Sequence, residues 1–124
     1  MDAISNEFNT TCEMFLDLIY SFTRNSDISF YKKAMKKLIN ADKSKIIEQF
    51  IIHCYSYKEQ VELKNTKYFI NLDLENKMNN ESLLQIIQIK ELFMTFNEDQ
   101  NNLIFEYLIL LCNFSTEYLR MKFN

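Results

Sequence analysis

Apolar residues recur along the start of the chain at alternating steps of three and four residues, the spacing of one face of an α-helix. From Ser5 to Thr23 this set consists of Phe8, Cys12, Phe15, Ile19 and Phe22. A second set follows Ser26 and Asp27, two residue types that cap helices well, and consists of Ile28, Tyr31, Met35 and Leu38. The pattern therefore predicts two amphipathic helices at the start of the chain.

The middle of the chain is less regular. The stretch from Asn40 to Asp42 predicts a break, with Asp42 as the N-cap of a third helix. The apolar face of that helix is expected to contain Ile46, Ile47, Phe50, Ile51, Cys54 and Tyr57. Over residues 58–80 the pattern weakens and predicts short helices joined by a loop. It is helical again from Glu81 to Phe96, through Ile86, Ile89, Phe93 and Phe96.

The last helix has the clearest signals. Asn97 is a strong N-cap with Gln100 three residues later, the spacing of a capping box. Its apolar stripe is predicted as Leu103, Tyr107, Leu110, Leu111, Phe114, Tyr118 and Met121, with Phe114 in the core. Ile104, Phe105 and Leu108 widen the apolar arc beyond one stripe. A helix this apolar is either central to its bundle or covered by a partner, and we expect it to be central.

The chain contains neither glycine nor proline. Without glycine, P-loops, GxGxxG turns and GxSxG nucleophile elbows are excluded. Left-handed turns would have to use Asn or Asp, the next most tolerant residues. Asparagine falls where helices are expected to end, at Asn25, Asn40, Asn65, Asn71, Asn79, Asn80 and Asn97. These features favour an all-α fold, a compact bundle of five to seven helices with a central C-terminal helix.

Length and composition predict one domain over residues 1–124. The chain has 124 residues, of which 48% are aliphatic or aromatic, enough to bury a core without disulfides. No signal peptide and no apolar run of about 20 residues is visible, so neither export nor a membrane span is expected. The odd count of cysteines (Cys12, Cys54 and Cys112) is typical of reduced, buried thiols in a cytosolic or nuclear protein, and we expect a cytoplasmic location.

Candidate chemistry is sparse. The one histidine, His53, adjoins Cys54, but adjacent helical positions point about 100° apart and no second pair of zinc ligands follows. The carboxylate pairs Glu59/Glu62 and Asp73/Glu75 lie in polar surroundings that favour solvated charges. We therefore predict no enzyme activity, no catalytic or metal-binding residue, no cofactor and no small-molecule substrate.

Charge is distributed unevenly. Residues 24–45 contain seven basic and two acidic residues, whereas the whole chain has a net charge of −3. Lys32, Lys33, Lys36 and Lys37 form two rows at i, i+4 spacing that could contact phosphates of nucleic acid or of an anionic membrane. Their simpler interpretation is a solvated helix face, and an isoelectric point near 5.2 disfavours a dedicated nucleic-acid binder. Two aromatic residues off the main stripes, Tyr20 and Phe105, are predicted to contact a protein partner.

Three stretches resemble a viral family. They are Phe15-Leu16-Asp17-Leu18 with Phe22, then residues 50–55 with Tyr68-Phe69, then residues 91–93 followed by 104–111. Their order resembles small helical proteins of unknown function from large nucleocytoplasmic DNA viruses, the relatives of mimivirus and phycodnaviruses. The family pattern has a proline where Thr23 stands and tryptophans where Phe93 and Phe105 stand. The resemblance implies an all-helical fold and a viral source, and carries over no catalytic residues.

The size and composition also resemble the Bcl-2-like bundles of poxviruses, which would imply a groove for a partner's amphipathic helix. The combined expectation is a non-enzymatic protein–protein interaction or assembly component, in a viral particle or viral factory, located in the host cytoplasm or the virion. A protein partner or self-association is expected. The alternatives are a nucleic-acid-associated accessory protein that uses the lysine rows and a Bcl-2-like bundle that binds a partner helix.

Overall fold

The computed structural model describes residues 2–72 and 82–123, and these residues form helices and contain no strand. The predicted all-α fold is confirmed. The first part of the chain forms α1 (Asp2–Thr23), α2 (Ser26–Ala41), α3 (Lys45–Cys54), a 3₁₀ turn η1 (Tyr55–Tyr57), α4 (Lys58–Glu62) and α5 (Thr66–Asn71). The second part forms α7 (Leu83–Ile86), α8 (Ile89–Thr95) and α9 (Glu98–Phe123).

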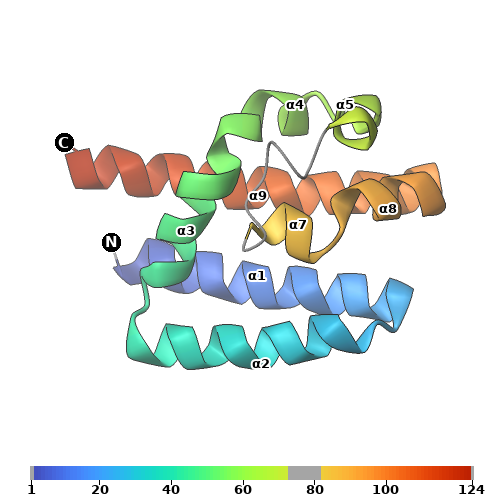
Figure 1. Ribbon diagram of the computed structural model, residues 1–124. Helices are drawn as coiled ribbons and strands as arrows, with labels where there is room; N and C mark the ends of the chain where they lie inside the picture. Colours follow the sequence, from blue (N-terminus) through green and yellow to red (C-terminus); the bar gives the residue numbers. More distant parts are fainter. Residues whose placement is uncertain (1, 73–81, 124) are drawn as a thin grey trace.

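The long helices α2, α1 and α9 lie side by side, and each runs antiparallel to the next (Figure 1). Helix α3 crosses them near one end and contacts α1, α2, α7 and α9. The short helices α4 and α5 lie on the far side of α9 from α1, and α5 packs on α8. Helix α9 thus contacts both halves of the bundle, as its apolar composition predicted.

Aromatic rings pack together at two places in the core. Phe69 of α5, Phe93 of α8 and Phe105 of α9 have ring centroids 4.7 to 6.0 Å apart. At the other end of the bundle Phe8 packs edge-to-face on Phe50, with centroids 5.3 Å apart. Such aromatic pairs add stability beyond the area they bury. The three-ring cluster connects the short helices α5 and α8 to α9. The Phe8–Phe50 pair connects α1 to α3.

Asparagine caps three helices. Asn97 and Gln100 form the predicted capping box, in which each side chain accepts from the other residue's backbone N–H, at 2.8 and 3.1 Å. Asn65 caps α5 by accepting a hydrogen bond from the N–H of Tyr68. Asn25 caps α2 through the N–H of Asp27, so the prediction of Ser26 or Asp27 as the cap is wrong by one or two residues.

The predicted helix boundaries in the middle of the chain have different outcomes. Asp42 accepts from the N–H of Ser44 and follows α2, so it does not cap α3, which begins at Lys45. Short helices within residues 58–80 are confirmed up to Asn71. The predicted turn positions Asn79 and Asn80 lie outside the described residues.

Within residues 2–72 and 82–123, left-handed turns do not use asparagine or aspartate. The positive φ values belong to Arg24, Lys64 and Gln88, at 51–55°. Each stands at the end of one helix, and in two cases the next residue is a capping asparagine, Asn25 or Asn65. The asparagines are therefore needed as caps, where their side-chain oxygens accept hydrogen bonds. The residue before the cap turns the chain instead.

The buried face of α9 is rotated relative to the predicted stripe. The buried residues are Ile104, Phe105, Leu108, Leu111, Cys112, Ser115 and Tyr118. Phe114 is only half-buried, which corrects its assignment to the core, and Leu103, Leu110 and Met121 are exposed. The arc of apolar residues was wide enough to support either choice, because a helix wheel does not say which part of such an arc packs inward.

Candidate interaction surfaces

An apolar surface runs along the outer side of the contact between α1 and α9. Leu103, Leu110, Met121 and Met14 are between 40% and 52% exposed there. The half-buried Leu18, Tyr107 and Phe114 lie between them. We call these seven residues the α1–α9 face. Large apolar side chains that stay exposed side by side mark interaction sites more often than isolated ones do.

Stacking of Phe15 on Tyr107, with centroids 5.5 Å apart, fixes where this face lies. On α1, Met14 lies on one side of Phe15 and the buried Leu16 on the other. On α9, Leu110 lies on one side of Tyr107 and the buried Leu108 on the other. Met14 and Leu110 therefore flank the contact on its solvent side.

The α9 part of the face follows a heptad spacing. Leu103, Tyr107, Leu110, Phe114 and Met121 stand at the a and d positions of one register. Glu117, the remaining position of this register, pairs with Arg120. This spacing forms a straight stripe about five turns long, the kind of surface that accepts another helix.

Acidic residues border the face. Helix α1 carries Asp2, Glu7, Glu13 and Asp17 and no basic residue, and Asp17 pairs with Lys32 of α2. Because α1 and α9 are antiparallel, Glu7 comes level with Phe114, two turns from the Phe15–Tyr107 stack. Exposed Glu106 adjoins Leu110 on α9. The border of the face is therefore net negative.

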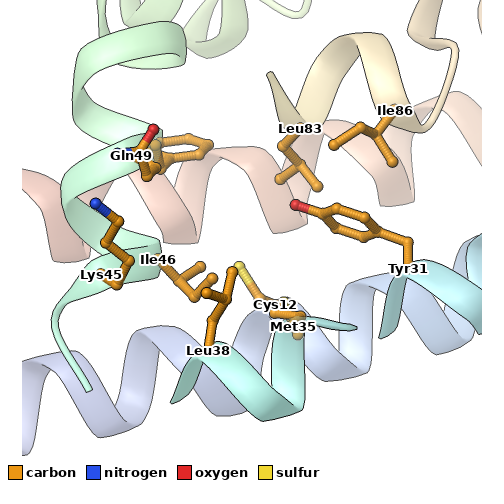
Figure 2. Close-up of a pocket in the computed structure, with 10 residues that line it drawn as sticks. Cys12, Tyr31, Met35, Leu38, Lys45, Ile46, Gln49, Leu83 and Ile86 are labelled. Atoms are coloured by element: carbon orange, nitrogen blue, oxygen red, sulfur yellow. The ribbon is translucent and has the colours of Figure 1, made fainter. Parts of the chain in front are cut away.

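Helices α1, α2, α3 and α7 enclose a half-open cavity of about 450 Å³ (Figure 2). Its lining residues are Cys12, Tyr31, Met35, Leu38, Lys45, Ile46, Gln49, Phe50, Leu83 and Ile86. Leu38 belonged to the predicted core stripe of α2, but it is partly exposed at this cavity. Sequence periodicity predicted that most of these residues face the core. It could not show that the apolar faces of the four helices leave a cavity between them.

Of the four lysines in the two rows, Lys32 forms an ion pair. Lys32 Nζ lies 2.5 Å from the Asp17 carboxylate of α1. Lys33, Lys36 and Lys37 are exposed, and none of them pairs with a carboxylate in the described part of the chain. Phe30 is 76% exposed, and it shares a face with Lys33 and Lys37 at i, i+3, i+7 spacing. The sequence reasoning missed Phe30, although this spacing was visible in it.

The two predicted partner contacts differ in outcome. Phe105 is 1% exposed and stacks on Phe93, so its prediction as an interface residue is wrong. Phe105 lies outside the predicted stripe, because the buried face of α9 is rotated from that stripe towards Phe105. Tyr20 is half-buried with Arg24 over its ring, 5.6 Å from the centroid, and its role in an interface stays a prediction.

His53 and Cys54 point to different partners. His53 Nε2 is 3.2 Å from Gln49 Oε1, whereas the Cys54 thiol is 3.4 Å from the Ser82 hydroxyl. Burial raises the pKa of the Cys12 and Cys54 thiols and raises the pKa of Cys112 to about 12. All three are buried free thiols. Protonated thiols of this kind are poor nucleophiles and poor metal ligands.

Other candidate chemistry is equally dispersed. Within residues 2–72 and 82–123, no three His, Cys, Asp or Glu side chains gather closely enough to hold a metal ion. Glu62 pairs with Lys58, and the Asp73/Glu75 pair lies outside the described residues. None of the helices in the described ranges combines the length and apolarity needed to cross a bilayer.

Comparison of the chain with protein-family models, with curated proteins and with solved structures found no match. The resemblances to viral helical proteins and to Bcl-2-like bundles therefore stay predictions.

Proposed function

We propose that the protein is a non-enzymatic interaction module that binds a basic amphipathic helix of a partner protein on its α1–α9 face. The observation that carries the proposal is the row of exposed apolar side chains, spaced in heptads on α9 and continued by Met14 and Leu18 on α1. Two antiparallel helices form a groove in which a third helix buries its apolar stripe.

Charge selects the kind of partner. Glu7 and Glu106 border the apolar row, and α1 contributes no basic residue. Two copies of this chain would bring these acidic borders together, which disfavours self-association across the face. A partner helix with Lys or Arg beside its apolar stripe would complement them. A role in a viral particle or viral factory is a further proposal that rests on the resemblance alone.

A model peptide tests this proposal. The probe is a fluorescein-labelled amphipathic helix of leucine and lysine, compared by fluorescence anisotropy with the same pattern in which glutamate replaces lysine. We expect the lysine peptide to bind at least tenfold more tightly, with a preference that weakens as salt is added. Leu110→Ser should weaken binding about tenfold, because it removes a leucine side chain from the contact.

Leu63→Ser is the matched control, because it removes the same side chain from an exposed position at the end of α4, the helix on the far side of α9 from α1. It should leave binding unchanged. Equal binding of both peptides, or equal effects of the two substitutions, would contradict the proposal. A dimer in light scattering that Leu110→Ser dissociates, without peptide binding, would assign the face to a second copy.

Phe30 supports a second candidate, a contact with nucleic acid on the outer face of α2. An exposed aromatic ring beside Lys33 and Lys37 could stack on a base while the ammonium groups contact phosphates. Single-stranded and duplex DNA are the probes, titrated across salt concentration. The candidate predicts tighter binding of the single strand, a steep loss with salt and a loss of the single-strand preference in Phe30→Ala. No measurable binding at low salt would remove it.

A further inference from the structure

The cavity between α1, α2, α3 and α7 has a lysine at one end and mainly apolar side chains at the other (Figure 2). Lys45 and Gln49 lie four residues apart on α3 and so project together on one side. Leu83 and Ile86 of α7 line the opposite side, and Tyr31 of α2 points its hydroxyl group towards Leu83. The arrangement matches an amphiphilic molecule, which has a charged headgroup at one end and a hydrocarbon chain at the other.

We propose that this cavity binds one amphiphilic molecule with a single carboxylate and a straight hydrocarbon chain of about ten to twelve carbons. The cavity would hold the chain among Met35, Leu38, Ile46, Phe50 and Ile86. The carboxylate would lie at the Lys45 ammonium group and the Gln49 amide. The site is on a different part of the molecule from the α1–α9 face, and it stands independently of the proposed function.

Charge supports an anionic headgroup such as a carboxylate over a cationic one. Lys45 is the one charged residue among the described residues that line the cavity. It is exposed, and no carboxylate from residues 2–72 or 82–123 pairs with it. A cationic headgroup would meet a like charge there, whereas an anionic one would be attracted.

Volume sets the length of the chain. The cavity of about 450 Å³ falls within the range of small-molecule sites in proteins. A methylene group takes roughly the volume of a water molecule, about 30 Å³, so the cavity has room for about fifteen heavy atoms. A carboxylic acid with ten to twelve carbons has about that size. Its apolar walls gain little from water but much from a hydrocarbon.

Methionine methyl groups report binding at this position. In protein labelled with ¹³C at the methionine methyls, sodium decanoate should shift the signal of Met35, which lines the cavity. The signals of Met94 and Met121, which are exposed elsewhere, should stay in place. Affinity should rise about fourfold per methylene from hexanoate to decanoate, because each added group is buried.

Headgroup variants test the polar end. Lys45→Gln should weaken decanoate about three- to fivefold and leave decanol unchanged, whereas the control Lys33→Gln should alter neither. Decyltrimethylammonium should bind more weakly than decanoate. A Met35 signal that does not move would overturn the site, and a decyltrimethylammonium affinity equal to that of decanoate, or an unaffected Lys45→Gln, would overturn the carboxylate assignment.

Discussion

Three long polar side chains occupy backbone conformations that glycine usually takes. Arg24, Lys64 and Gln88 have positive φ, and each follows the last turn of a helix. At Lys64 the turn is a Schellman motif, in which Lys64 N–H donates to Val61 and Asn65 N–H donates to Gln60. A left-handed conformation costs a residue with a Cβ about 1–2 kcal/mol. A chain without glycine accepts that cost at each of these positions.

Gln88→Gly should therefore stabilise the protein by about 0.5–1 kcal/mol, because glycine removes the Cβ contact that disfavours the left-handed region. Gln88 is exposed and caps α8 without a side-chain hydrogen bond, so the substitution removes little else. Urea denaturation measures the change. The control Glu91→Gly, inside α8, should destabilise by about 0.5–1 kcal/mol. Equal effects of the two substitutions would mean that the turn is not left-handed.

Because of the buried thiols, the free energy of unfolding depends on pH in the alkaline range. Burial raises the pKa of Cys12, Cys54 and Cys112 above the unfolded value near 9.0, so the folded state keeps protons that the unfolded state loses. The free energy of unfolding therefore decreases as pH rises through 9. The slope for one cysteine is about 1.4 kcal/mol per pH unit, and it persists for Cys112 up to about pH 12.

Urea denaturation between pH 8 and pH 10.5 measures this effect. The stability of the natural chain should fall steeply above pH 9, and Cys112→Ala should have a shallower slope by about one cysteine's contribution. The comparison of slopes is independent of the packing that the substitution removes, because that loss is the same at every pH. Equal slopes would show that Cys112 ionises as readily in the folded chain as in the unfolded one.

At the scale of elements, sequence predicted the existence of helices better than their orientation. Alternating steps of three and four identified α1, and the capping box located the start of α9 correctly. The orientation of α9 was predicted wrongly because its apolar arc is wider than the buried face. Only the positions of α1, α5 and α8 decide that Phe105 faces inward and Leu110 outward.

Paired substitutions on α9 check this orientation. Phe105→Ala should cost about 3–5 kcal/mol, since its ring is enclosed by Phe69 and Phe93. Phe114→Ala should cost about 1–2 kcal/mol, because that ring is half-buried at the α1–α9 face. Denaturant unfolding of both variants gives the comparison. A larger loss at Phe114 than at Phe105 would support the predicted stripe instead of the one observed.

At the scale of the whole molecule, two surfaces remain incompletely covered by the chain's own residues in the described ranges. The α1–α9 face is long, straight and bordered by acids, whereas the cavity beside α3 is compact and has a lysine at one end. The cavity could not be located from sequence alone, because it arises where inward-facing residues of different helices fail to meet. The α9 row of the α1–α9 face was visible in the sequence as an apolar stripe, but the sequence did not show that this stripe faces solvent. The candidate residues chosen from sequence were single aromatics and lysines, and the surfaces are made by several helices together.

The most direct test of the proposed function is to map by NMR where a partner helix contacts the molecule. In protein labelled at the methionine methyls, the leucine–lysine peptide should shift Met14 and Met121, which belong to the α1–α9 face. Met35 in the cavity and Met94 on α8 should not move. Shifts at Met35 or Met94 with Met14 and Met121 unchanged, or no shift at any of the four, would contradict the account.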